Sequence, residues 1–134
     1  MQIMSEQLRI RSATKITDEK LNLTQEWDKV FPKSDKVDHK KVTFHNRYGI
    51  MLAANLYTPK NAVGELPAIA VSGPFGAVKE QSSGLYAQKM AEYGYLTIAF
   101  DPSYTGESGG QPRYFLFPGC FYCPCFVNQL GFCW

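Results

Sequence analysis

The spacing of apolar residues predicts four strands and one helix between residues 41 and 100. Residues 41–46 alternate between polar and apolar side chains, which is typical of a half-buried strand. A turn at residues 47–49 and a second strand between Ile50 and Thr58, ended by Pro59, predict an antiparallel hairpin. The continuous apolar runs 66–71 and 95–100 predict two strands that are buried on both faces.

A helix is expected between these two runs, from Gln81 or Ser82 to Tyr93, with Gly94 as its stop. The side chains available for burial on this helix are Leu85, Met90 and Ala91. A strand, a helix and a strand in this order imply a right-handed crossover between parallel strands. The sequence therefore predicts an α/β fold, with a β-hairpin followed by a parallel β-α-β unit whose last strand forms an open edge.

Residues 1–40 form a polar segment of mixed charge, in which one short helix is expected. Thr17 or Asp18 can cap the start of this helix, and Phe31-Pro32 ends it. Its partial apolar stripe consists of Leu21, Leu23, Trp27 and Val30. We interpret it as a helix on the rim of the domain that residues 41–113 form.

The composition changes abruptly after Arg113, because residues 114–134 carry no charge and hold all four cysteines. Pro and Gly interrupt this segment and disfavour a membrane anchor. Cys120, Cys123 and Cys125 include one C-x-x-C pair, but a zinc site usually has a second pair or nearby histidines. A disulfide needs an oxidising compartment, which no signal sequence indicates. We favour a tail that is not the natural continuation of the domain and comes from a frameshift, an aberrant gene end or a sequence error.

The overall composition excludes several classes of function. The formal net charge is +2, which is too balanced for a nucleic-acid-binding protein recruited by bulk electrostatics. No uninterrupted apolar stretch approaches the length of a membrane-spanning helix, and the N-terminus lacks the order of a secretion signal. We expect a cytoplasmic protein without nucleic-acid or membrane partners, and the sequence leaves its oligomeric state open.

Two loops at the carboxyl ends of the predicted parallel strands are the candidate site, because open parallel sheets bind ligands there. These loops are residues 72–79 and 101–110, with Gly73, Pro74, Asp101 and Tyr104 as lining residues. Pro74 has no N–H, so the N–H of Phe75 or Gly76 would be the donor to an oxyanion. An ordinary tight turn into a helix accounts equally well for the same glycines.

Other motifs favour a structural role over chemistry. Gly106 to Gly110 match G-x-S-x-G, but a nucleophile elbow joins a strand directly to a helix, and no acid or histidine follows Ser108. His39 and His45 are interpreted as strand or surface residues, and Lys79-Glu80 as a surface pair. No phosphate-binding glycine motif is present.

Residues 42–50, 53–59, 67–81 and 99–110 together resemble the N-terminal third of α/β-hydrolases. The branch that they resemble is the dienelactone-hydrolase-like or Xaa-Pro-peptidase-like group, whose D-x-x-G-x-G-x-S loop is similar to residues 101–108. The resemblance runs from about residue 26 to Arg113, and it is specific because several motifs occur in order at suitable spacing.

The resemblance implies an eight-stranded, mostly parallel sheet flanked by helices. It also implies a Ser or Cys nucleophile on an elbow after the next strand, followed by an Asp and then a His. The first oxyanion donor would be the N–H of Phe75, with Gly76 as the alternative, and residues 106–110 would be a structural loop. The elbow, the acid and the histidine have no matching positions after Arg113, so no catalytic set is complete.

The first functional hypothesis is an esterase-like hydrolase that cleaves an ester-like or amide-like carbonyl bond of a small molecule, with no metal and no organic cofactor. The chain as given is expected to be an inactive N-terminal part of such an enzyme. The second hypothesis is a small binding or interaction protein whose Cys-rich tail is either a zinc module, with Cys120, Cys123 and Cys125 as ligands, or a module that binds a partner.

Overall fold

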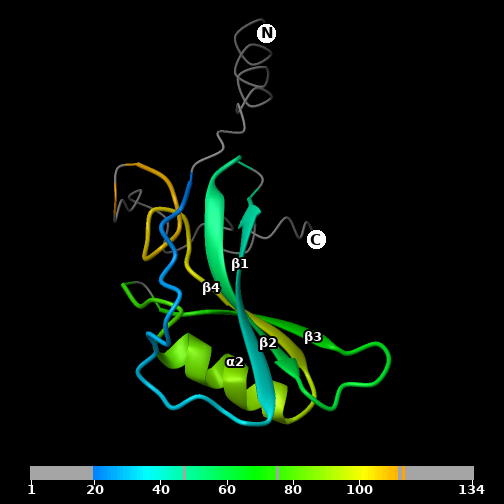
Figure 1. Ribbon diagram of the computed structural model, residues 1–134. Coiled ribbons are helices and arrows are strands. Elements are labelled where there is room, and N and C mark those ends of the chain that lie inside the picture. The colour runs from blue at the N-terminus through cyan, green and yellow to red at the C-terminus, as the bar shows by residue number, and fades with distance from the viewer. Residues whose placement is uncertain (1–19, 47, 75, 112, 114–134) are drawn as a thin grey trace, which may run out of the picture.

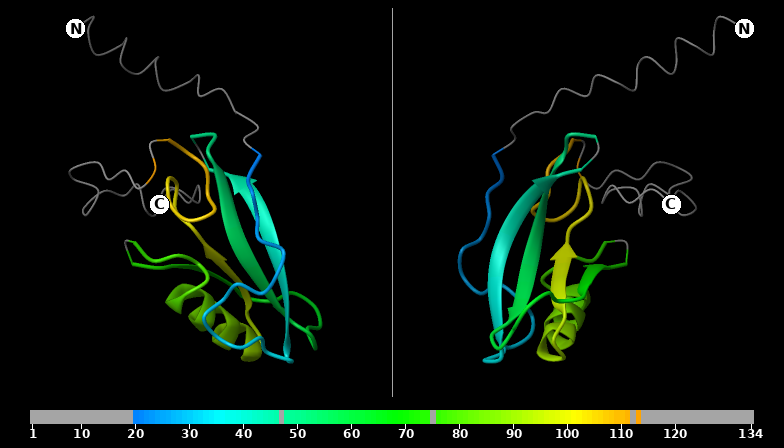
Figure 2. Two further views of the ribbon diagram at one scale, coloured as in Figure 1. Left: turned by 60° about the vertical axis from the view of Figure 1, so that its left-hand side comes forward. Right: turned by 90° about the vertical axis from the view of Figure 1, so that its right-hand side faces the viewer.

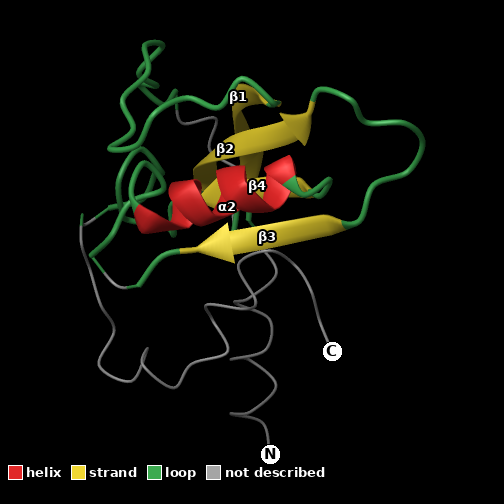
Figure 3. Cartoon of the chain, turned by 90° about the horizontal axis from the view of Figure 1, so that it is seen from below, coloured by secondary structure: helices red, strands yellow, loops and turns green. Residues whose placement is uncertain are grey.

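The computed structural model describes residues 20–46, 48–74, 76–111 and 113. Strands β1 (Val37–His45), β2 (Met51–Pro59), β3 (Ala68–Ser72) and β4 (Leu96–Phe100) form one sheet in the order β1-β2-β4-β3. Helix α2 (Ser82–Glu92) lies across one face of this sheet (Figures 1 and 3). This is a partial α/β architecture, as the sequence predicts.

The antiparallel hairpin β1–β2 is confirmed, with pairing from Val37 opposite Pro59 to His45 opposite Met51. Asn46 closes its turn, because its side-chain oxygen accepts from the N–H groups of Tyr48 at 2.9 Å and Ile50 at 3.0 Å. The first strand begins four residues earlier than the alternation predicts, at Val37 instead of Lys41. Burial of Val37 in the main apolar cluster explains this longer strand.

Strands β3 and β4 are parallel, as expected, with Ala68 opposite Leu96 and Ser72 opposite Phe100. Strand β4 also pairs antiparallel with β2, so it lies inside the sheet, and the prediction that it forms an open edge is wrong. The prediction that the run 66–71 is buried on both faces is also wrong. Among the described strands, β3 has β4 as its single neighbour, and its side chains alternate between exposed and half-buried.

Helix α2 has the predicted bounds to within one residue, and Gly94 follows it at φ 99°. Leu85, expected to be buried, is 41% exposed. Ala91 is buried, as expected, and Met90 is half-buried; the other buried residues of the helix are Ser83, Gly84, Ala87 and Gln88. Small side chains are required because the helix lies close to its neighbours. A Cβ on Gly84 would lie 2.2 Å from the carbonyl oxygen of Lys79.

The described part of the N-terminal segment, residues 20–36, contains no helix, which corrects the expectation for residues 20–31. It runs as extended chain past the hairpin and turns toward α2 (Figure 2). Trp27 and Phe31 pack against the main cluster, and the indole N–H of Trp27 donates to the carbonyl of Phe31 at 2.8 Å. Tertiary contacts thus outweigh the weak helical pattern. Residues 17–19 lie outside the described residues.

No helix formed by the described residues is long and apolar enough to cross a membrane.

Candidate functional site

The loops that follow β3 and β4 meet at the carboxyl ends of these two parallel strands. The backbone N–H of Lys79 donates to Oδ1 of Asp101 at 2.8 Å, and its Nζ donates to Oδ2 at 2.8 Å. Both side chains are fully buried. Asp101, one of the residues expected to line a site, therefore joins the two loops through its hydrogen bonds to Lys79.

Lys79 is surrounded by three carboxylates, which corrects its interpretation as a surface residue. Its Nζ lies 2.8 Å from Asp101, 2.7 Å from Glu107 and 2.7 Å from Glu80. Burial alone would lower the pKa of Lys79, but the charge of Asp101 and the hydrogen bonds to the three carboxylates outweigh burial and raise that pKa. Lys79 therefore carries a positive charge inside the protein.

The ion pairs extend to β1 and to the N-terminal segment. Lys41 Nζ lies 2.8 Å from Glu107 and 2.7 Å from Asp28, which also pairs with Lys29 at 2.8 Å. Burial would raise the pKa of Glu107, yet the hydrogen bonds from Lys41 and Lys79 lower it to about 2. We name these residues the charge cluster: Asp28, Lys29, Lys41, Lys79, Glu80, Asp101 and Glu107.

The carboxylates of the charge cluster have the spacing of a metal site, because oxygens of Asp28, Glu80 and Glu107 lie within 4.8 Å of one another. The ammonium of Lys41 lies 2.7 Å from Asp28, 2.8 Å from Glu107 and 3.7 Å from Glu80. Lysine charges thus already compensate the carboxylates. We interpret the cluster as a structural ion-pair network that ties the N-terminal segment, β1 and both loops together.

Asp101 also determines the conformation of the loop that follows it. The N–H of Glu107 donates to Oδ2 of Asp101 at 3.0 Å. Gly106 has φ 55°, and a Cβ there would lie 2.2 Å from the same oxygen. This position therefore requires glycine, both for its conformation and for the close approach of the carboxylate.

Ser108 is a structural residue, as the interpretation of residues 106–110 expects. It is 1% exposed. Its Oγ accepts from the N–H of Ala53 at 2.8 Å and donates to the carbonyl of Asp101 at 2.7 Å. The guanidinium of Arg113 donates to the carbonyls of Ser108 and Gly106. With its hydroxyl engaged in both directions, Ser108 is not available as a nucleophile.

Tyr104 lies in the same loop, half-buried, with the unusual backbone angle φ 69°. Its N–H donates to the carbonyl of Gly109 at 2.8 Å, and a Cβ on Gly110 would lie 2.6 Å from its ring. In the D-x-x-G-x-G-x-S pattern, Tyr104 stands where the first glycine would be, which accounts for the left-handed backbone. We did not predict this strained backbone from the sequence, although a tyrosine at the glycine position of the motif is a signal for it.

The candidate oxyanion loop forms a tight turn, in which the N–H of Ala77 donates to the carbonyl of Pro74 at 3.0 Å. Gly76 has φ 82°, a left-handed conformation that favours glycine, and nothing lies within 4 Å of a Cβ built there. Its N–H has no acceptor among the described residues. Phe75 lies outside the described residues, and Gly73 packs near Ala77 and Ser83.

His39 and His45 both lie on β1, as expected, at the far side of the sheet from β3. His39 Nε2 lies 3.0 Å from the side-chain oxygen of Asn55, and its ring contacts those of Trp27 and Tyr57. Within the part of the chain that the structure describes, neither histidine reaches Asp101 or Ser108 by a hydrogen bond. Cys120, Cys123 and Cys125 lie outside the described residues.

Comparison with known proteins yields relatives and a fold, but no family model matches the chain. The uncharacterized protein PA2218 of Pseudomonas aeruginosa is 74% identical over 98 residues, which cover 72% of this chain and 26% of that protein. The uncharacterized protein YcjY of Escherichia coli is 49% identical over 77 residues, which cover 54% of this chain and 25% of that protein. The chain thus spans about a quarter of the length of these relatives.

Solved structures show the same architecture. The crystal structure of PA2218 matches with a TM-score of 0.69, covering 72% of this chain and 30% of that one. An acetyl xylan esterase from Paenibacillus sp. R4 matches with a TM-score of 0.52 at 17% identity, covering 81% of this chain and 33% of the esterase. The chain therefore contains part of an α/β-hydrolase-like fold.

Proposed function

We propose that residues 20–113 supply the N-terminal part of a hydrolase that cleaves an ester-like or amide-like carbonyl bond, and that this chain alone does not perform the reaction. The observation that carries this proposal is the turn after β3, at the carboxyl end of a parallel strand, where Gly76 is exposed and its N–H has no acceptor among the described residues. Open parallel sheets bind ligands at these ends. The dienelactone-hydrolase-like branch and a small-molecule substrate belong to the same proposal.

The reaction class is nucleophilic acyl transfer. A nucleophile attacks the carbonyl carbon, and negative charge develops on the carbonyl oxygen in the tetrahedral intermediate. The N–H of Phe75 or of Gly76 would donate a hydrogen bond to that oxygen. Nucleophile, acid and histidine have no counterpart among the described residues, and in the longer relatives they would come from the part that this chain does not match.

The charge cluster anchors the chain just after the proposed donor turn. Lys79 lies three residues after Gly76 and is held to Asp101 through both its backbone N–H and its ammonium. A donor aimed at developing charge is effective when it is fixed before the reaction begins. The two bonds between Lys79 and Asp101 fix the chain three residues after Gly76 and so contribute to that rigidity.

The proposal is tested with a chimera in which residues 20–113 replace the matching region of PA2218. Both the natural relative and the chimera are assayed with a nitrophenyl ester, alongside the 134-residue chain. We expect turnover by the relative and by the chimera, and none by the chain alone. The proposal is contradicted if the chimera folds but shows no turnover in an assay in which the relative is active.

A paired substitution in the chimera tests the donor turn. Gly76→Pro removes the N–H of residue 76 and, because proline cannot adopt φ 82°, also disrupts the turn itself. Gly64→Pro places the same strain at another exposed glycine, with φ 76° and nothing within 4 Å. We expect Gly76→Pro to lower kcat by about 10²-fold, the usual cost of one oxyanion donor. Gly64→Pro should leave kcat unchanged. The second hypothesis, a binding protein with a zinc tail, rests on residues outside those described.

A further inference from the structure

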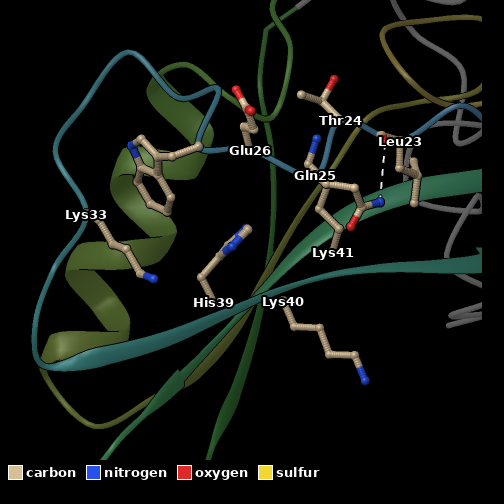
Figure 4. Close-up of a pocket in the computed structure, with 9 residues that line it drawn as sticks. Leu23, Thr24, Gln25, Glu26, Lys33, His39, Lys40 and Lys41 are labelled. Carbon is tan, nitrogen blue, oxygen red and sulfur yellow. Dashed lines mark hydrogen bonds between the residues drawn. The ribbon is translucent and has the colours of Figure 1, made fainter.

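A cavity of about 430 Å³ lies between the N-terminal segment and strand β1 (Figure 4). None of its lining residues belongs to the loops 72–79 or 101–110. Its volume falls within the range of small-molecule sites, which is roughly 300–1,000 Å³. Trp27 and His39 contribute aromatic surface to its wall. The cavity is therefore large enough to hold a ligand of its own.

The free charges that line this cavity are mostly positive. Lys33 and Lys40 form no ion pair with any residue that the structure describes, and Glu26 is the single carboxylate in the lining. Lys41 also lines it, but Asp28 and Glu107 already compensate that ammonium. Figure 4 shows the Lys33 side chain ending beside His39, while Lys40 extends on the other side of strand β1, away from both. A small anion is the ligand that these charges favour.

His39 offers a neutral hydrogen-bond acceptor beside these cations. The Nδ2 of Asn55 donates to Glu80 at 3.4 Å, so its Oδ1 faces Nε2 of His39 at 3.0 Å. Nε2 is then the protonated nitrogen, and Nδ1 is left as the acceptor of the ring. Burial lowers the pKa of His39, and the charges of Lys29 and Lys41 lower it further, which keeps the imidazole neutral near pH 7.

We propose that this cavity binds a small carboxylate that carries a hydroxyl group. The ammonium of Lys33 faces the carboxylate, and Nδ1 of His39 accepts a hydrogen bond from the hydroxyl. Trp27 provides the apolar wall against which the carbon skeleton of the ligand packs. This site is independent of acyl transfer, because it shares no residue with the donor turn.

Proton and nitrogen NMR of the full 134-residue chain tests the proposal, with lactate as the probe. His39 has an internal control in His45, which lies at the other end of β1 and does not line the cavity. We expect a saturable shift of the His39 ring signals and no shift at His45. Acetate, which lacks the hydroxyl, and methyl lactate, which lacks the charge, should each bind more weakly than lactate.

Two variants separate the site from general charge attraction. Lys33→Gln should weaken lactate binding about two- to fivefold, the range of one exposed charge contact. Lys60→Gln removes an exposed lysine that does not line the cavity and should leave binding unchanged. The proposal is overturned if His39 shows no saturable shift with lactate, or if both lysine variants bind lactate equally.

Discussion

Lys79 holds Asp101 at both carboxylate oxygens, with its backbone N–H on Oδ1 and its ammonium on Oδ2, each at 2.8 Å. The two residues lie 22 positions apart, one in the loop after β3 and one at the end of β4. Because both side chains are fully buried, water cannot replace either partner. This pair joins the two loops that border the proposed site.

Replacing Lys79 should destabilise the protein strongly. Lys79→Met leaves the buried Asp101 and the carboxylates of Glu80 and Glu107 without their central cation, and breaking a buried pair costs about 3–5 kcal/mol. Lys89→Met removes an exposed pair with Glu92 and should cost at most about 1 kcal/mol. Urea unfolding measures both free energies. Equal small losses would show that the ion pairs do not support the fold.

Gly106 should not tolerate a side chain. In Gly106→Ala the new Cβ would lie 2.2 Å from Oδ2 of Asp101, so the loop or the carboxylate must move. Gly64→Ala is the matched control, because Gly64 also has positive φ but open space around it. We expect the control to lose about 1 kcal/mol from backbone strain alone, and Gly106→Ala to lose clearly more. Thermal unfolding of both variants compares them, and similar melting temperatures would contradict the close packing.

We expect the protein to lose stability in acid, and the carboxylates of the charge cluster determine the pH range of this loss. Burial would raise the pKa of Asp28 and Glu107, but hydrogen bonds from their lysine partners lower both to about 2. Unfolded Asp and Glu titrate near 3.9 and 4.3, so the stabilisation is complete above these values and is lost as the pH falls toward about 2. Melting temperatures between pH 6 and pH 2 measure the loss.

Glu107→Gln provides the control for this acid transition. The amide cannot titrate, so the variant should be less stable than the natural chain at pH 6 and should lose less on acidification. If the melting temperatures of both proteins fall equally on acidification, protonation of Glu107 does not cause the loss of stability.

Ser108→Ala should affect stability by the loss of two buried hydrogen bonds. The N–H of Ala53 and the carbonyl of Asp101 would each lose the partner that Oγ provides. An unsatisfied buried group costs about 1–3 kcal/mol, so the loss of both partners should cost about 2–6 kcal/mol. In the chimera, kcat at a temperature where the variant is folded should not change. Loss of kcat in a folded variant would instead give Ser108 a chemical role.

The sequence alone determined the local elements of this protein. Alternation over residues 41–46 identified the hairpin, and Gly94 identified the end of α2. These signals are local, because side-chain periodicity and turn residues act within a few positions. The strand-helix-strand order also determined that β3 and β4 are parallel and that their loops meet at one edge of the sheet.

Only the tertiary structure decided the course of residues 20–31, the place of β4 inside the sheet, and the charge cluster. Phe31 lies in the core and Trp27 packs against it without forming a helix, because this packing outweighs a weak helical stripe. Glu107 binds both Lys41 and Lys79, which are 66 and 28 positions away in the sequence. No local pattern encodes such partners, since ion pairs between distant residues form only when folding brings their strands and loops together.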